Sequence, residues 1–313
     1  MEKTAVVVNP MAAGGKLGKR WPDVARVLGR ELGAFETLTT QASRDATRLT
    51  RDALRGGADV VVAIGGDGTI HEVANGFFDD GKPIRPAAAL AVIPYGTGGD
   101  FRKSIDMPTD VAAAAAIIKK GHTRDIDVGR LTYTTRGGTE SSMFINIASF
   151  GIGGRVDQLV NTSSKMWDGK TAFMLATLRA TFTYKNQKVR MVFDGKEDAF
   201  VELTINSVAV ANGRYFGGGM KMAPNAELDD GQFDVVAVGD VGIWDLVTKA
   251  GHLYKGTHLT LPKVSSWRAA RVDARPVVAG DEVLLDVDGE APGHLPATFV
   301  LLPRALKVVV PNG

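Results

Sequence analysis

DVVVAIGGDGT, at residues 59–69, is the stretch that decides the fold of this 313-residue chain. Its first six residues predict a buried β-strand, and a helical pattern follows from Thr69 to Phe77. A glycine-rich turn at such a junction brings backbone N–H groups close to a phosphate, and the helix N-terminus adds positive charge. A tight turn with a helix cap is the simpler alternative. Three glycines, an aspartate and a threonine together favour phosphate binding.

Outside this stretch, short β-branched runs alternate with helical patterns. The predicted strands cover residues 5–8, 35–39, 59–64 and 88–93, and the predicted helices cover residues 19–31, 43–55, 69–77 and 109–119. Alternation of this kind predicts a mostly parallel sheet with helices on both faces. A second glycine-rich loop, Pro94 to Phe101, follows the fourth strand. Because neighbouring parallel strands end at one crevice, the two loops together favour a nucleotide site.

After Gly121 the pattern changes to closely spaced short strands, which predicts an antiparallel β-sandwich. We therefore expect an N-terminal α/β domain over residues 1–121, with the tail 304–313 a candidate to return to it. A larger antiparallel β-sandwich domain is expected over residues 122–303. One helix, Lys170 to Tyr184, interrupts the strands.

The composition is that of a globular protein: hydrophobic residues make up 44% and charged residues 23%, and the formal charge is +2. Such a small net charge argues against nucleic acid as a partner. The chain has no cysteine, which excludes disulfides, thiolate zinc sites and cysteine nucleophiles. We see neither a signal peptide nor an apolar run long enough to cross a bilayer, so we expect a cytoplasmic protein.

The late motif Asp288-Gly289-Glu290 follows an alternating strand, Val283 to Val287. Taken alone, Asp-Gly is a frequent hairpin signal, and a turn aspartate is the favoured interpretation. The five histidines are scattered, so no serine–histidine–aspartate or histidine metal arrangement competes for a catalytic role.

The order of motifs resembles the diacylglycerol kinase catalytic domain family, which includes bacterial lipid kinases, sphingosine kinases and ceramide kinases. The resemblance covers nearly the whole chain, and its parts are Asn9-Pro10, Gly65 through Gly76, Pro94 through Phe101, Met222 through Gly231, and Asp288 through Glu290. The Gly65–Thr69 motif alone is less specific, because NAD kinases and phosphofructokinases are similar there.

The resemblance implies an ATP- and Mg²⁺-dependent lipid kinase with the following site residues. The nucleotide-binding positions are Asn9, Thr40, Gly65, Gly66, Asp67, Gly68, Thr69, Ile70, His71, Glu72, Gly96 and Thr97. Asp288 and Glu290 match the family's catalytic acidic group, which accepts the proton of the lipid hydroxyl, and Asp67 is the third candidate catalytic residue. Its charge repels phosphate oxygens, so Asp67 acts through magnesium or orders the loop. Glu227, Asp230 and Gln232 match a structural metal site of bacterial members.

Two positions depart from the family pattern. Gly99 and His71 stand where the family commonly has asparagine. Gly99 lacks a side-chain donor near the phosphates and suggests a divergent subgroup, and we interpret His71 as a helix residue rather than a base.

Three functions remain open from the sequence. The leading one is a lipid kinase that contacts the membrane peripherally, through the helix Lys170 to Tyr184 with Lys165, Trp167 and Lys185, or through the basic segment Lys16 to Arg30. The alternatives are a kinase of soluble substrates, of the NAD kinase or phosphofructokinase type, and a nucleotide-binding module without catalysis. The sequence identifies neither the lipid nor the proton acceptor, and it leaves the oligomeric state, a homodimer included, undecided.

Overall fold

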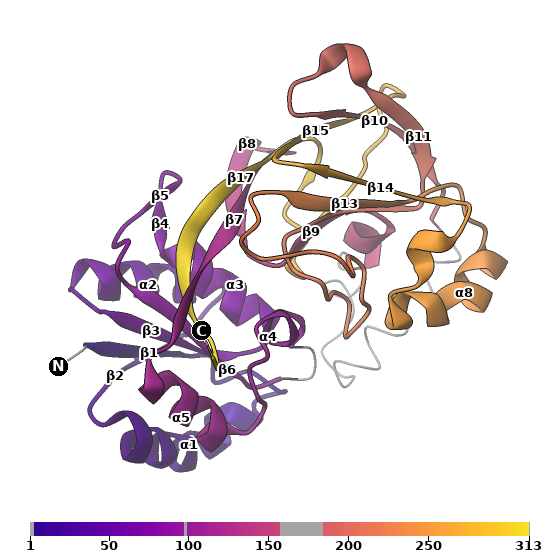
Figure 1. Cartoon of the computed structure of the whole chain (residues 1–313). Coiled ribbons are helices and arrows are strands. Elements are labelled where there is room, and N and C mark those ends of the chain that lie inside the picture. Colours follow the sequence, from indigo (N-terminus) through magenta and orange to yellow (C-terminus); the bar gives the residue numbers. More distant parts are fainter. Residues whose placement is uncertain (1–2, 97–98, 157–183, 313) are drawn as a thin grey trace. The chain divides into compact units, whose positions relative to one another are not determined.

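A computed structural model describes residues 3–96, 99–156 and 184–312 (Figure 1). The chain divides into two compact units: unit 1 comprises residues 1–128 and 303–313, and unit 2 comprises residues 129–302. Two strands, β7 (Thr123–Thr135) and β17 (His294–Val309), contain the boundaries. The predicted fold class, an α/β domain followed by an antiparallel sandwich, is confirmed.

The centre of unit 1 is a parallel sheet with the strand order β6-β3-β1-β2. Its strands are β1 (Thr4–Val8), β2 (Glu36–Thr39), β3 (Val60–Gly65) and β6 (Ala89–Pro94). The end of β17 extends the sheet through Lys307, which pairs with Ala89. Every residue of β3 and β6 is buried, because a parallel sheet has both faces covered.

Helices cover the two faces of this sheet (Figure 1). They are α1 (Lys16–Leu32), α2 (Asp45–Arg55), α3 (Asp67–Gly76), α4 (Asp100–Ser104) and α5 (Val111–Lys120). Helix α1 packs against α5, and α2 packs against α3. A small hairpin, β4 (Phe78–Asp79) and β5 (Lys82–Pro83), follows α3. Helix α5 shows how sequence sets the bounds: Asp110 accepts a hydrogen bond from the Ala113 N–H at 2.8 Å, and Gly121 ends the helix in a left-handed conformation.

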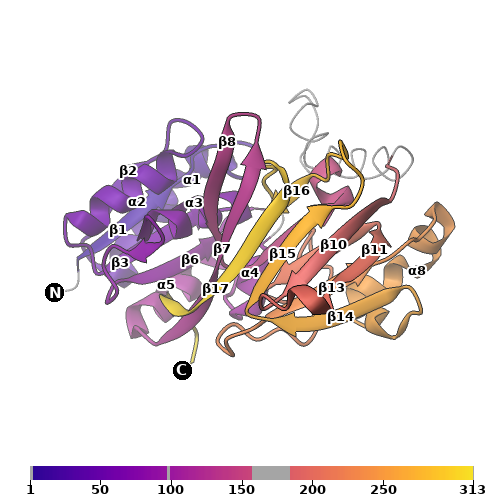
Figure 2. The ribbon, with the colours of Figure 1, turned by 90° about the horizontal axis from the view of Figure 1, so that it is seen from above.

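Unit 2 is built from two sheets (Figure 2). The first has the order β11-β10-β15-β17, with β7 beside β17 and β8 beside β7. Its further strands are β8 (Gly138–Phe144), β10 (Gln187–Phe193), β11 (Val201–Ile205) and β15 (Arg271–Pro276). The second, β14-β13-β12-β9-β16, comprises β9 (Ile147–Gly151), β12 (Ser207–Ala211), β13 (Phe233–Val238), β14 (Val264–Ala269) and β16 (Leu285–Val287).

Aromatic side chains fill the core of unit 2. The rings of Phe144 and Phe233 stack at 5.5 Å between centroids, and those of Phe150 and Phe299 lie 6.0 Å apart. A second cluster, with Ile147, Met222 and Val236, is covered by α8 (Ile243–Lys255) and the short 3₁₀ helix η2 (His258–Thr260). Another short 3₁₀ helix, η1 (Glu197–Ala199), precedes β11.

Three details differ from the sequence-based expectations or lie beyond them. Helix α8 was not predicted. The sequence pattern from Phe200 to Ala211 predicts one strand, but the segment forms two strands in different sheets, β11 and β12. The Asn206 N–H bonds to Val238 O at 2.9 Å and turns the chain into the second sheet. The predicted helix Lys170 to Tyr184 lies, except for Tyr184, outside the described residues.

Candidate active site

The phosphate-binding candidates of unit 1 lie at one edge of the parallel sheet. Asn9 follows β1, Thr40 follows β2 and Gly65 ends β3. Backbone bonds align these ends: the Thr40 N–H donates to Val8 O at 2.9 Å, and the Tyr95 N–H donates to Gly65 O at 2.8 Å. The edge is therefore the carboxyl end of four adjacent strands, where open α/β sheets bind ligands.

The first glycine loop wraps closely around Thr69. A Cβ at Gly65 would lie 2.5 Å from Thr69 Oγ1, so only glycine fits there. Thr69 is buried, and its hydroxyl accepts a hydrogen bond from Asn9 Nδ2 at 3.1 Å. Gly66 precedes the first residue of α3, and a Cβ added at Gly66 would meet open space. Gly68 and Ile70 lie within the first turns of α3, and Ile70 is buried.

Asp67 joins the two glycine loops. Its Oδ2 accepts a hydrogen bond from Gly99 N at 2.8 Å, and its Oδ1 accepts from Asp100 N at 3.0 Å and from Phe101 N at 3.4 Å. Burial raises the pKa of the Asp67 carboxyl, the neighbouring Asp100 charge raises it further, and the three N–H groups oppose both. Of the two roles left open for Asp67, this geometry favours ordering of the loop.

The second glycine loop contacts the first. A Cβ on Gly96 would lie 3.2 Å from the Gly66 Cα. Gly99 has φ +67°, in the left-handed region. Glycine and asparagine are the residues that tolerate this conformation best, which explains why both types suit the position. Thr97, also predicted here, lies outside the described residues.

Asp100 is a site residue that the sequence reasoning missed. Its carboxyl is 5% exposed and forms an ion pair with Lys103 Nζ at 2.7 Å. It is the first residue of α4 and follows Gly99 directly. The sequence signal that could have identified Asp100 is an acidic residue at the start of a helix, directly after a pair of glycines.

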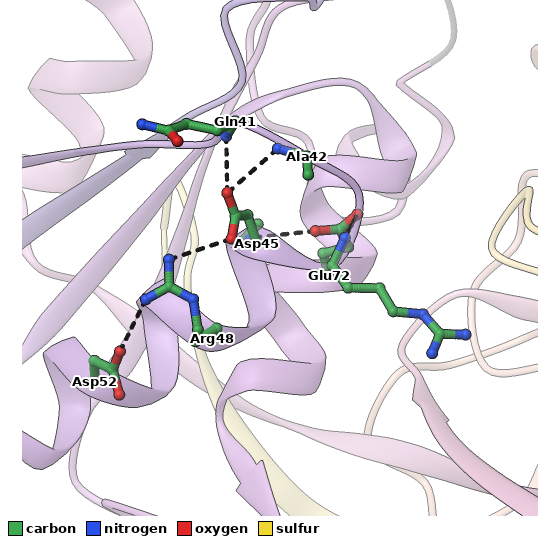
Figure 3. A network of polar contacts seen from close by, with 8 residues as sticks. Gln41, Ala42, Asp45, Arg48, Asp52 and Glu72 are labelled. Atoms are coloured by element: carbon green, nitrogen blue, oxygen red, sulfur yellow. Dashed lines mark hydrogen bonds and ion pairs between the residues drawn. The ribbon is translucent and has the colours of Figure 1, made fainter.

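Glu72 reaches away from the glycine loop to the N-terminus of α2 (Figure 3). Its Oε1 accepts a hydrogen bond from Arg44 N at 2.9 Å, and its Oε2 accepts from Ala46 N at 3.1 Å. Asp45 accepts from Gln41 N at 2.9 Å, next to Thr40. Glu72 and Asp45 thus hold the segment between β2 and α2. His71 is buried on α3, and Asn75 Nδ2 donates to its backbone O at 2.9 Å.

In unit 2, the late acidic motif forms a tight hairpin turn. Val287 and Glu290 exchange backbone hydrogen bonds at 2.8 and 3.0 Å, and the residues between them, Asp288 and Gly289, have φ of 50° and 91°. Two positive φ angles are typical of this two-residue turn. The turn predicted from the Asp-Gly pair is therefore present. The carboxylates in and next to this turn differ in the hydrogen bonds that they accept.

Asp288 and Asp286 are held by hydrogen bonds. The Asp288 carboxylate accepts from Ile145 N at 3.2 Å and from Ile147 N at 3.0 Å. Asp286, which the sequence reasoning missed, is buried and accepts from Gly289 N at 2.9 Å. Glu290 is exposed, and its carboxylate makes no hydrogen bond or ion pair with the part of the chain that the structure describes.

Comparison with known proteins identifies the family. The profile of the diacylglycerol kinase catalytic domain matches residues 3–131, and that of the YegS C-terminal NAD kinase beta sandwich-like domain matches residues 146–310. A diacylglycerol kinase of Staphylococcus carnosus (strain TM300) is 32% identical over 322 residues, which cover 100% of this chain and 96% of that protein. The chain belongs to the diacylglycerol kinase family. The resemblance noted in the sequence is confirmed.

Solved structures agree with this membership in the diacylglycerol kinase family. A candidate diacylglycerol kinase from Bacillus anthracis str. Sterne superimposes with a TM-score of 0.78 at 27% identity, over 99% of this chain and 95% of that one. A yeast NADH kinase complexed with NADH superimposes with a TM-score of 0.50 at 11% identity, over 99% of this chain and 83% of that one. The latter similarity shows a shared fold alone.

The predicted metal residues of this family member lie between Ala226 and β13. The Asp230 carboxylate accepts a hydrogen bond from Gln232 N at 3.1 Å and forms an ion pair with Arg268. Burial raises the pKa of nearby Asp234; Arg268 opposes the rise, and the Asp230 and Glu227 charges add to it. Within residues 3–96, 99–156 and 184–312, no group of three or more His, Cys, Asp or Glu side chains could hold a metal ion.

Proposed function

We propose that this diacylglycerol kinase family member transfers the γ-phosphoryl group of ATP to a hydroxyl group of a membrane lipid. One observation carries the proposal: the Asp67 carboxylate ties two glycine-rich loops together at the carboxyl edge of a parallel sheet. Such loops present backbone N–H groups to phosphate oxygens. The lipid acceptor is supported by the similarity to the Staphylococcus carnosus relative, which is a diacylglycerol kinase.

The loops fit a nucleotide because glycines leave the space that phosphates need. Added Cβ atoms would strike Thr69 at Gly65 and approach Gly66 at Gly96, so side chains there would close the loops. We assign ATP to the domain of residues 1–121, through Asn9, Thr40, the residues from Gly65 to Glu72, Gly96 and Thr97. Glu72 supports ATP binding by holding the segment after Thr40 in place. Mg²⁺, when bound with ATP, neutralises phosphate oxygens.

We assign the lipid to the domain of residues 122–303, and the proton of its hydroxyl to Glu290. Phosphoryl transfer to an alcohol needs a carboxylate that accepts this proton. Both oxygens of Asp288 accept hydrogen bonds from backbone N–H groups, which hold its carboxylate in place within the turn. The exposed carboxylate of Glu290 has no such contacts within the described residues. Asp288 shapes the turn that presents Glu290.

The metal set of Glu227, Asp230 and Gln232 also remains a proposal. Arg268 already neutralises Asp230, so a cation would have to displace that guanidinium. Elemental analysis of the purified protein tests this point. A stoichiometric divalent cation that disappears in Asp230→Ala supports the site, and a metal-free protein of full stability contradicts it.

A single assay tests the proposed function. The purified protein is incubated with Mg²⁺, γ-labelled ATP and an extracted lipid mixture, and the label is measured in the organic phase. We expect labelled lipid that disappears on chelation of Mg²⁺ and in Glu290→Gln. Label on NAD or a sugar phosphate instead would favour the soluble-substrate kinases. ATP binding without any transfer would favour a module that only binds nucleotide.

The membrane contact is part of this proposal, because a bilayer holds the acceptor. Of the surfaces predicted from sequence, the helix Lys170 to Tyr184 lies almost wholly outside the described residues. The basic segment Lys16 to Arg30 forms most of α1. No helix among the described residues has the length and apolar character needed to cross a membrane.

A further inference from the structure

Helix α8 of unit 2 packs on the sandwich with only one of its faces. Leu253 packs against the cluster that includes Ile147, Met222 and Val236. At the C-terminal end of the helix, Lys221 N donates to Leu253 O at 2.9 Å, and Gly256 ends the helix in a left-handed conformation. These contacts fix the orientation of α8 on the second sheet (Figure 1).

Helix α8 also exposes two large aromatic side chains. Trp244 is 78% exposed and Tyr254 is 57% exposed, and Trp244 has the largest exposed fraction among the exposed large hydrophobic residues. Ten residues separate them, which places them about 15 Å apart along the helix and about 80° apart around it. Both side chains therefore lie on the same side, near opposite ends, and a flat surface can contact both.

Four lysines lie on α8 and on the segments next to it. Lys249 and Lys263 both pair with Asp245, at 2.7 and 3.1 Å, and their hydrogen bonds lower the Asp245 pKa to about 2. Lys255 is exposed, and the Lys221 side chain lies against Gly256 at the end of the helix. Within the described part of the chain, neither of these two ammonium groups forms an ion pair. Four lysines against Asp245 and the exposed Asp240, which precedes the helix, leave this surface positive.

We propose that the outward face of α8, with Trp244, Tyr254, Lys221 and Lys255, docks this protein on the headgroup layer of an anionic bilayer. The proposal rests on the proposed function, because a lipid kinase must reach its acceptor at a membrane. Indole and phenol rings favour the membrane interface, where their apolar bodies and polar tips are both satisfied. Lysines beside them attract anionic headgroups.

Charge argues against the main alternative occupant, a second copy of this chain. A symmetric contact through α8 would place the same lysines opposite one another, because a two-fold interface pairs identical surfaces. Like charges held close together oppose such a contact. An anionic bilayer complements both the charge and the aromatic side chains.

Sedimentation with vesicles tests the docking surface on the full chain. Vesicles of phosphatidylcholine alone are compared with vesicles that also contain phosphatidylglycerol. We expect binding to the anionic vesicles, with a loss of about tenfold or more in the double variant Trp244→Ser, Tyr254→Ser. Lys221→Gln and Lys255→Gln should each reduce binding about fivefold at low salt and have little effect at high salt.

Matched controls are available in the same unit. Phe200, which is 45% exposed, directly precedes β11 of the other sheet, and Lys196 lies four positions before it, so Phe200→Ser and Lys196→Gln make the same kinds of change away from α8. Trp244→Phe adds a conservative variant. It should fold normally yet lose most of the fluorescence quenching by brominated lipids, although three other tryptophans remain.

The possible results separate this inference from the proposed function. Binding that is equal for wild type and the α8 variants, or absent for wild type, overturns the docking surface whatever the kinase activity. The surface is also overturned if wild type is a dimer that the α8 variants convert to monomers. If docking holds, the variants should phosphorylate a short-chain, soluble lipid acceptor at the wild-type rate and lose activity on vesicle lipid. No activity on either acceptor, with α8-dependent binding, would contradict the proposed function alone.

Discussion

The sequence offered Asp288 and Glu290 as candidate proton acceptors and Asp67 as a residue that acts through magnesium or orders the loop, and their contacts distinguish them. Asp67 accepts three backbone N–H groups and Asp288 accepts two. Glu290 is exposed, and its carboxylate makes no hydrogen bond or ion pair in the described part of the chain. A carboxylate engaged by several N–H donors holds a loop in place, whereas an exposed carboxylate without such partners can contact a substrate hydroxyl.

Replacing Asp67 by asparagine should stop turnover with only a moderate loss of stability. The amide NH₂ would face the N–H groups of the second glycine loop, so at least one hydrogen bond is lost and the loops separate. We expect kcat to fall by about two to three orders of magnitude. Asp80→Asn, in the exposed β4–β5 turn, is the matched control. Near-normal turnover of Asp67→Asn would show that the loop link is not needed.

The variants Glu290→Gln and Asp288→Asn should affect different properties, the first turnover and the second stability. Glu290→Gln should lower kcat by about two to four orders of magnitude without changing ATP affinity, because the proton is accepted in the transition state. Asp288→Asn should lower the free energy of unfolding by about 1–3 kcal/mol, because its NH₂ opposes the Ile145 or Ile147 N–H. Steady-state kinetics and denaturant titration measure the two effects. Wild-type rates in both variants would contradict the carboxylate mechanism.

At the scale of elements, the start of α2 is fixed by a side chain from another helix. Neither α2 nor α3 has a side-chain cap from its own N-cap residue. Glu72 of α3 supplies two acceptors to the start of α2 instead. The segment after Thr40 therefore depends on a helix that follows it by more than twenty residues.

Glu72→Gln should weaken both α2 and ATP binding. The glutamine NH₂ cannot accept from Arg44 or Ala46, so we expect a loss of about 1–2 kcal/mol in the free energy of unfolding. The KM for ATP should rise several-fold while kcat at saturating ATP changes little, because the Thr40 segment binds nucleotide and does not react. Thermal unfolding and ATP titration check this. Glu36 is an exposed glutamate on β2, so Glu36→Gln is the control. An equal effect in that variant would contradict the capping role of Glu72.

At the scale of the whole molecule, groups in both units contribute to the free energy of unfolding. The pH dependence of unfolding distinguishes the contributions of titratable groups. His258 of unit 2 is buried, and its Nε2 lies 3.0 Å from Met222 O. Burial lowers the pKa of this imidazole, the exposed His252 charge lowers it further, and backbone hydrogen bonds to Met222 and His252 oppose the shift. A histidine with a lowered folded-state pKa binds its proton more readily when the chain is unfolded.

The sign of the pH effect follows from this difference. The contribution of His258 is fully present above its ordinary pKa of 6.5 and is lost as the pH falls below that value toward the folded-state pKa. We expect the denaturant midpoint to fall between pH 7.5 and about 5.5. His258→Gln, which can still donate to Met222 O, should remove much of this dependence. An unchanged pH dependence in the variant would assign the effect to other groups.

The sequence by itself determined the fold class, and the location proposed for the nucleotide site rests on its glycine-rich motifs. Runs such as Val60–Ile64 report burial directly, because a strand covered on both faces must be apolar throughout. The glycines near Asp67 indicate the local backbone geometry, because this geometry depends on residues close by in the sequence. Helix α8 carried a weaker signal: Asp245 in its first turn, Lys255 in its last and Gly256 after it.

Only the tertiary structure decided which partners the carboxylates have and which face of α8 is exposed. Asp67 meets Gly99 across 32 positions of sequence, and Asp288 meets Ile147 across 141. Hydrophobic patterning gives the side of an element that is buried, but the pairing of polar groups depends on how distant loops are brought together by packing. A hydrogen bond is short and directional, so its partners are fixed only when the sheets and helices are in place.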